Sequence, residues 1–256
     1  MKYNHAAADV AFINGEYEKA SRMYYEGARE GEIKAAFNYA HCLRFGYGVD
    51  IDIKGAKSFY TYARELEGGA ALYNLAILYL EGGVIEQDFK KALSYMHASA
   101  QEGCVEAMLY LGMAYTTGYL LYPDVIGISI IPFHKPIIRD ESIFLLTGDA
   151  IDAEADEERR FSALAADGRR AFEFFRAAAL HDPTYVEDLV AKGQYLYAKC
   201  YLDGMGTDFD RNKALTLMLV AGKSGSSDAV EYLQSNGITT EMLLEAAKEV
   251  RNRNKK

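Results

Sequence analysis

The residues of this chain that could perform chemistry are its histidines, cysteines and acidic clusters, and their spacing limits the chemistry open to them. His41 precedes Cys42, and His97 lies seven residues before Cys104. Both pairs combine metal-ligand types, but neighbouring residues on a helix point about 100° apart. Gly103 is expected to end the helix that carries His97, which separates the second pair. Neither pair predicts a metal site.

A second set of candidate residues lies further along the chain. His134, Asp140 and Glu141 could serve a small-molecule site or a hydrolytic site. The acidic run over residues 149–158 lacks the glycine and glutamate spacing of a calcium loop and favours a solvated helix face. No phosphate-binding loop, nucleophile elbow or dinucleotide fingerprint occurs in the sequence. We therefore expect no enzymatic activity, no metal and no cofactor.

The elements that position these residues follow a fixed period. Gly46, Gly82 and Gly118 lie 36 residues apart. The same spacing separates a set of alanines: Ala20, Ala56 and Ala92. Before each glycine, apolar residues recur at helical spacing, and a second helix is expected to open at Ala56 and Ala92. A period of this size is typical of one helix–turn–helix unit stacked on copies of itself, which predicts an all-α fold.

The period predicts a single array over residues 1–256. The expected repeats cover approximately residues 3–34, 35–70, 71–106, 107–182 and 190–225, and capping helices follow over 226–256. One of those capping helices is expected over residues 242–251.

The fourth repeat departs from the period, because 53 residues separate Gly118 from Ala171 where sister copies take ten. We therefore predict an insertion over residues 119–165. Its β-branched stretches at 125–131 and 142–146 predict a small hairpin-like element, and residues 154–166 predict a helix. The insertion either packs onto the array as filling or binds a partner, and the sequence leaves both interpretations open.

The repeated pattern resembles the Sel1-like repeat family, a branch of the tetratricopeptide-like solenoids. One copy is carried by Ala35, Tyr39, Ala40, Leu43, Gly46, Gly48, Val49, Asp52, Ala56, Phe59, Tyr60 and Ala63. The next is carried by Ala71, Leu75, Ala76, Tyr79, Gly82, Asp88, Lys91, Ala92, Gly103 and Ala107. The resemblance implies an all-α, right-handed α-solenoid that binds proteins or peptides and performs no chemistry.

The resemblance also implies where a partner would lie, because the first helix of each unit lines the concave face in tetratricopeptide-like folds. Carried onto this chain, the inner rows contain Phe37, His41, Arg44, Tyr73, Ile77, Leu80, Leu109, Met113, Tyr195 and Lys199. This mixture of apolar and aromatic side chains suits an extended or helical peptide. The alternative is that the superhelix buries these rows as core.

Charge and composition narrow the function further. The net charge of −9 argues against binding to nucleic acid, which needs a basic surface. No run of 18 or more apolar residues suggests a membrane span, and residues 1–9 contain no apolar segment typical of a signal peptide. The three cysteines, Cys42, Cys104 and Cys200, follow no repeating spacing within the repeats and are expected to be buried and reduced. We therefore expect a cytoplasmic protein. Some members of the Sel1-like family are secreted and carry a disulfide in each repeat, and this chain does not resemble them.

These observations favour a non-enzymatic adaptor or scaffold that binds a peptide or protein segment in its concave groove. The alternative is a binder of small molecules or cell-wall fragments, or a hydrolase, with a site at residues 119–165. A deep polar pocket with converging ionisable groups would favour the alternative, and an open trough would favour the adaptor.

Overall fold

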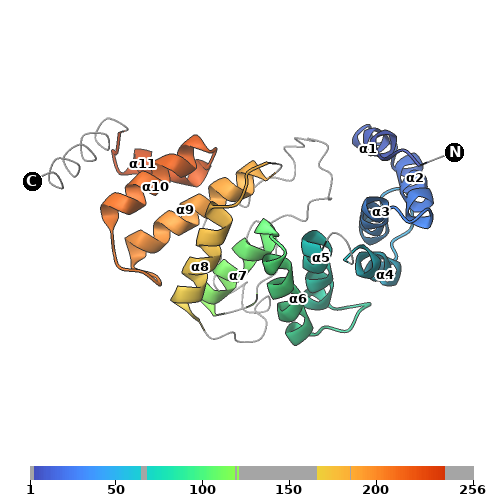
Figure 1. Ribbon diagram of the computed structural model, residues 1–256, viewed down its shortest axis with the longest axis horizontal. Coiled ribbons are helices and arrows are strands. Elements are labelled where there is room, and N and C mark those ends of the chain that lie inside the picture. Colours follow the sequence, from blue (N-terminus) through green and yellow to red (C-terminus); the bar gives the residue numbers. More distant parts are fainter. Residues whose placement is uncertain (1–2, 65–67, 119, 121–165, 185, 240–256) are drawn as a thin grey trace, which may run out of the picture. The chain divides into compact units, whose positions relative to one another are not determined.

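The computed structural model describes residues 3–64, 68–118, 120, 166–184 and 186–239. Within these residues the chain forms eleven α-helices and no strand, which confirms the predicted all-α repeat fold (Figure 1). The helices are α1 His5–Ile13, α2 Tyr17–Arg29, α3 Ile33–Phe45, α4 Ile53–Ala63, α5 Gly68–Glu81, α6 Phe89–Gln101, α7 Val105–Thr117, α8 Gly168–Ala179, α9 Glu187–Asp203, α10 Arg211–Lys223 and α11 Ser227–Ser235. The predicted hairpin-like element, the helix over 154–166 and the helix over 242–251 fall on residues outside these ranges or only at their edge.

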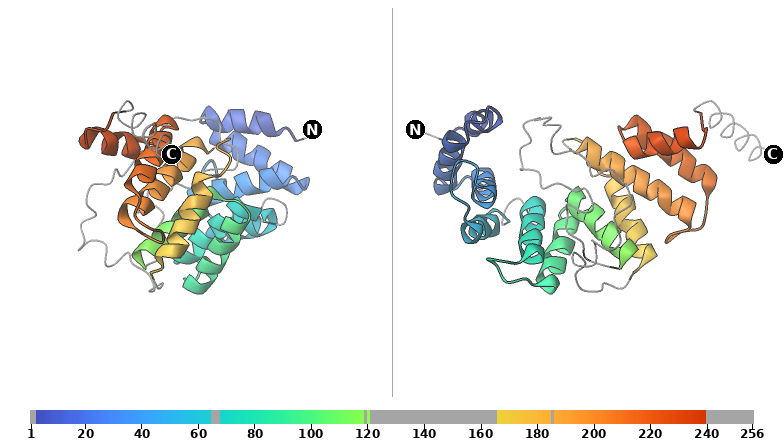
Figure 2. Two further views of the ribbon diagram at one scale, coloured as in Figure 1. Left: turned by 60° about the vertical axis from the view of Figure 1, so that its left-hand side comes forward. Right: turned by 180° about the vertical axis from the view of Figure 1, so that it is seen from behind.

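The helices belong to two compact units. The first contains α1 to α6 and the second contains α8 to α11, with the boundary inside α7. In the first unit, α1 packs against α2, α3 against α4 and α5 against α6, and each pair also contacts the next. Figure 2 shows these neighbours from two further directions. In the second unit, α9 packs against both α8 and α10, and α10 packs against α11. Whether both units form one continuous array stays a prediction.

Aspartate side chains start four of the helices, α4, α6, α8 and α10, whereas α2 begins after Glu16 without a side-chain cap. Asp52, Asp88, Asp167 and Asp210 all have an extended backbone, and each accepts a hydrogen bond from a backbone N–H two or three residues later. This arrangement satisfies a donor that the first helical turn leaves without a partner. The second helices therefore begin at Ile53 and Phe89, three residues earlier than the alanines suggested.

Glycines end the first helices, as predicted. Gly46, Gly82, Gly118 and Gly204 adopt φ angles of 74°, 71°, 76° and 65°. A side chain would strain the backbone in this left-handed region, and glycine enters it without that cost.

A backbone hydrogen bond then closes the loop between the two helices of a pair. The N–H of Asp52 donates to the carbonyl of Leu43 at 2.8 Å, and the N–H of Asp88 donates to the carbonyl of Tyr79 at 3.0 Å. The N–H of Asp167 makes the same bond to Tyr115 at 2.9 Å, although this loop is much longer. The α7–α8 pair is therefore closed in the same way as its shorter sisters.

The core of each pair combines small residues with one large side chain. Ala56 and Ala92 are buried, as predicted for the close crossing of two helices, and Tyr60 and Met96 fill the space beside them. Gly112 of α7 lies at a close crossing, because a Cβ at that position would overlap the ring of Phe175 on α8. The larger phenylalanine is accommodated by the smaller partner.

Candidate functional site

The inner rows that the sequence selected are mostly buried. Seven of the ten predicted partner-binding residues are at most 6% exposed: Phe37, His41, Arg44, Tyr73, Ile77, Leu80 and Leu109. The other three, Met113, Tyr195 and Lys199, are partly exposed and all lie in the second unit. Binding of a partner along these rows stays a prediction. Of the ten residues, these three are the most accessible for direct contact with a partner.

The buried polar residues of the inner rows form a cluster between α3, α4 and α5. The Nδ1 of His41 shares a hydrogen bond of 2.8 Å with the hydroxyl of Tyr60. Arg44 donates from Nη1 to Oδ1 of Asn74 at 3.3 Å and from Nη2 to Oε1 of Glu81 at 2.6 Å. These bonds link three helices of the first unit, so the cluster serves to fix their packing.

His41 is neutral in this cluster. Burial lowers the pKa of His41 to about 3, and the nearby Arg44 guanidinium adds to the effect. Its Nε2 finds no hydrogen-bond partner in the part of the chain that the structure describes. Among those residues, no three His, Cys, Asp or Glu side chains converge as a metal site either. A buried imidazole held neutral in this way is poorly placed to exchange protons with a substrate.

The three cysteines are buried and form no disulfide with one another, as predicted. Burial raises the pKa of Cys42 and Cys200 to about 12 and raises that of Cys104 well above its ordinary value. Since the thiolate is the nucleophile, these thiols are unreactive in the folded protein. His134, Asp140, Glu141 and the acidic run over 149–158 lie outside the described residues.

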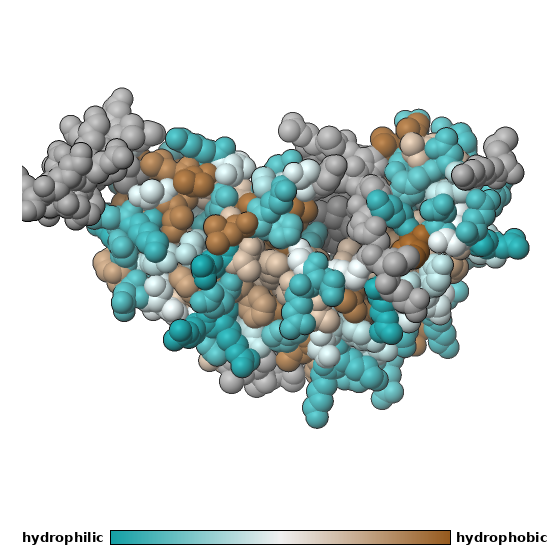
Figure 3. All heavy atoms as spheres, viewed as in Figure 1, coloured by the Kyte–Doolittle hydropathy of each residue, from teal (hydrophilic) through white to brown (hydrophobic). Residues whose placement is uncertain are grey.

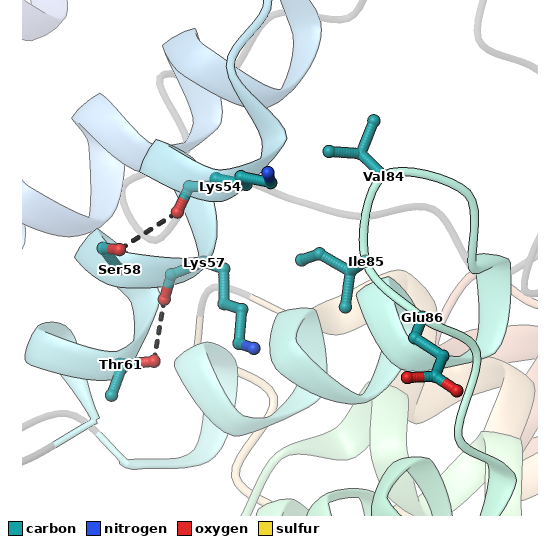
Figure 4. Close-up of a pocket in the computed structure, with 7 residues that line it drawn as sticks. All are labelled: Lys54, Lys57, Ser58, Thr61, Val84, Ile85 and Glu86. Atoms are coloured by element: carbon teal, nitrogen blue, oxygen red, sulfur yellow. Dashed lines mark hydrogen bonds between the residues drawn. The ribbon is translucent and has the colours of Figure 1, made fainter.

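An exposed groove lies between α4 and the loop that follows α5 (Figure 4). Its volume is about 620 Å³, and it is lined by Lys54, Lys57, Ser58, Thr61, Val84, Ile85 and Glu86. We call it the α4 groove. Two ammonium groups face two aliphatic side chains across it, which is an arrangement suited to binding rather than to catalysis.

The loop side of the α4 groove is firmly held. Gln87 donates from Nε2 to the carbonyl of Leu80 at 2.7 Å, and the side chain of Ile85 is buried at 7% exposure. Val84, by contrast, is 61% exposed on the same loop. The apolar surface that Val84 presents is therefore preformed.

Elsewhere, the face seen in Figure 3 is largely hydrophilic, with hydrophobic side chains in small separate groups.

Sequence reasoning missed the α4 groove, although a signal for it existed. Val84 stands 36 residues after Gly48, where the repeat pattern places a second glycine, and Gly206 keeps that glycine in a later copy. A departure from a glycine position marks a place where the backbone of this repeat differs from its sisters.

Comparison with known proteins identifies the family. The Sel1 repeat pattern matches residues 33–67, 69–104, 105–125, 162–183 and 191–226. These segments make up more than half of the chain, which therefore belongs to the Sel1 repeat family. Sel1 repeat proteins generally mediate protein–protein interactions and are generally non-enzymatic.

Two relatives illustrate how far the similarity extends. A Sel1 repeat protein from Oxalobacter formigenes has a crystal structure that is similar over 86% of this chain and 49% of its own, with a TM-score of 0.58 and 20% identity. At that identity the likeness supports the fold alone. Chitin synthase regulatory factor 2 of Schizosaccharomyces pombe is 28% identical over 86 residues, which are 33% of this chain and 17% of the yeast protein. The chain thus spans half or less of either relative.

Among the described helices, none combines the length and the apolar character needed to cross a membrane.

Proposed function

We propose that this chain is a non-enzymatic adaptor that binds a segment of a partner protein on its array of repeats. The observation that carries the proposal is that residue types able to perform chemistry are buried in the packing of the helices. His41 and the three cysteines are buried and serve packing, while the repeat units themselves recur along the chain. Such an array offers surface for binding in place of a reaction centre. The name of the yeast relative, a regulatory factor, describes a role of the same general kind.

We place the binding segment along the inner rows, with Met113, Tyr195 and Lys199 as direct contacts, since these members of the rows are partly exposed. The buried members would act by holding the first helices in position. The buried thiols, which form no disulfide with one another, support a reducing compartment such as the cytoplasm.

Site-specific photo-crosslinking in the native cell tests this proposal. A benzophenone side chain placed at Met113 or Tyr195 should give a discrete crosslinked protein, which mass spectrometry identifies. The matched controls are Leu180 and Phe209, which are more exposed and lie outside the inner rows. Equal crosslinking at the controls, or no protein adduct at either inner position, would rule out the inner rows as the binding surface.

A further inference from the structure

We propose that the α4 groove is a docking site for an acidic peptide segment that carries an apolar side chain among its carboxylates. The site uses none of the residues of the inner rows, so it is a second binding surface beyond the proposed function. The proposal rests on the backbone of one loop, on two lysines and on one exposed valine.

Val84 stands where two sister loops carry a glycine, Gly48 and Gly206, that packs on the neighbouring helix. Gly48 packs directly against the first turn of α2, where a Cβ would overlap the backbone of Tyr17 and Glu18. Ser21 supports this contact by donating from its hydroxyl to the carbonyl of Gly48 at 3.3 Å. In the second unit, Gly206 packs in the same way on Gly168 at the start of α8.

Val84 cannot make the equivalent contact with α4. A side chain at this position would overlap the first turn of α4, just as a Cβ at Gly48 would overlap the first turn of α2. The loop after α5 therefore presents its valine beside α4 instead of pressing its backbone onto the helix (Figure 4). At Gly48 a smaller depression of about 510 Å³ remains beside the contact. The lysine that lines this depression, Lys19, is already paired with Glu16, with 2.7 Å between Nζ and Oε2.

The α4 groove carries two lysines and one glutamate, so its lining has an excess of positive charge. Within the described residues, neither Lys54 nor Lys57 has a carboxylate at ion-pair distance, whereas the nearby Lys91 is paired with Asp88 at 3.1 Å. The Nζ of Lys57 lies 4.9 Å from the ring centroid of Tyr79, which keeps this ammonium group at the groove. Two cations thus lie within reach of one ligand.

The hydroxyl groups of the groove suit a peptide backbone. Ser58 donates to the carbonyl of Lys54 at 3.0 Å, and Thr61 donates to the carbonyl of Lys57 at 2.8 Å. Because each hydroxyl hydrogen is used within α4, the oxygen lone pairs remain to accept from the N–H groups of a peptide.

Charge complementarity decides the occupant. Carboxylates of an acidic segment would meet Lys54 and Lys57, and the apolar side chain between them would lie on Val84. The net charge of −9 does not prevent this, since charges more than about 8 Å away are largely screened at physiological salt. Glu86 lies at one end of the groove and would orient the segment by repelling a carboxylate there.

Fluorescence anisotropy with a labelled peptide, acetyl-Glu-Asp-Leu-Glu-Asp-amide, tests the proposal on the full chain. Saturable binding should weaken about tenfold in the double variant Lys54→Glu/Lys57→Glu, because two exposed ion pairs are replaced by repulsion. Val84→Gly should weaken binding about fivefold, since the apolar contact is lost. Lys90→Glu, which changes an exposed lysine outside the groove, should leave the affinity within about twofold.

Three outcomes would overturn the proposal: no binding at millimolar peptide, equal binding after the double charge reversal, or equal binding of the peptide with glycine in place of leucine.

A single-stranded oligonucleotide serves as a further arm. If it binds with the same dependence on Lys54 and Lys57, the groove is a general anion site and not a peptide site. Circular dichroism of each variant excludes loss of fold as the cause. Failure here leaves the crosslinking result at Tyr195 unaffected, so the two proposals are separable.

Discussion

The guanidinium of Arg170 lies over the ring of Tyr115, although 55 residues separate them. The distance from Cζ to the ring centroid is 5.3 Å, and Nη1 donates to the tyrosine hydroxyl at 3.0 Å. In two other pairs the equivalent cation follows the tyrosine by 12 residues. Lys91 lies 5.3 Å from the ring centroid of Tyr79 and Lys213 lies 4.2 Å from that of Tyr201. The same contact therefore forms across loops of very different length.

Because the flanks of the long loop already meet, residues 119–166 should be dispensable for the α7–α8 pair. We expect that replacing them by the sequence of residues 47–51 leaves a folded helical protein. Loop closure depends only weakly on length, about 0.6 kcal/mol per doubling. Far-UV circular dichroism and cooperative urea unfolding measure the result. An unfolded variant would mean that this stretch belongs to the core, and loss of partner binding in a folded variant would assign recognition to it.

Gly112 should be intolerant of even the smallest side chain. Exchange of glycine for alanine inside a helix ordinarily stabilises by about 0.5–1 kcal/mol. At Gly112 the added Cβ would overlap Phe175, so we expect Gly112→Ala to destabilise by about 1–3 kcal/mol. The double variant Gly112→Ala/Phe175→Leu should recover part of the loss in urea unfolding. A single variant that is more stable than the parent would show that α7 and α8 are not in tight contact there.

The buried alanines of the first unit give a related prediction. Ala56→Phe and Ala92→Phe should each lower the free energy of unfolding by about 1–3 kcal/mol, because the crossings have no room for a ring. Ala177→Phe, on an exposed position of α8, is the matched control and should change stability by about 0.5 kcal/mol or less. Similar melting temperatures for all three variants would contradict the assigned helix crossings.

His41 should make stability depend on pH in a defined window. Its pKa is about 3 in the folded protein and 6.5 ordinarily, so between these values the unfolded chain binds more protons. The contribution is complete above pH 6.5 and is lost as the pH falls toward 3, by up to about 1.4 kcal/mol per pH unit.

Comparison of the parent with His41→Gln isolates the pH-dependent contribution of His41 to the free energy of unfolding. The stability difference between the parent and the variant should shrink as the pH falls from 6.5 to 4.5, measured by urea unfolding at each pH. The lowered pKa of His5 is common to both proteins and cancels in the difference. A difference that is constant across this range would show that folding does not lower the pKa of His41.

The cysteines should resist labelling until the protein unfolds. With pKa values of about 12 for Cys42 and Cys200, and all three side chains buried, almost no accessible thiolate is present at pH 8. Iodoacetamide should label none of them in the native protein and all three in urea. Fewer than three free thiols after unfolding without reductant would contradict the proposed reducing compartment.

The sequence predicted the fold well because a repeat period is a local and redundant signal. The helix-ending glycines and the buried alanines both follow from one alignment of the copies. Helix starts were less accurate, because the capping aspartates Asp52 and Asp88 lie upstream of the apolar pattern that revealed the helices. Accessibility of the inner rows could not be predicted, since burial of residues such as Ile77 and Leu80 depends on neighbouring repeats. The α4 groove was missed because it depends on two adjacent departures, Gly83 and Val84, within an otherwise regular pattern.

The substitution at Val84 has an evolutionary consequence. The second left-handed glycine of the loop lies one position earlier here, at Gly83 in place of the Gly48 position. Exchanges at two adjacent positions therefore separate a loop that presses on its neighbouring helix from one that bears an exposed aliphatic side chain. Both kinds of loop keep the backbone bond that the helix-ending glycine donates and the closing bond that the capping aspartate donates. A repeat protein of this kind can therefore acquire or lose a recognition point at one junction at a time, while selection on its stability continues to act on the rest of the array.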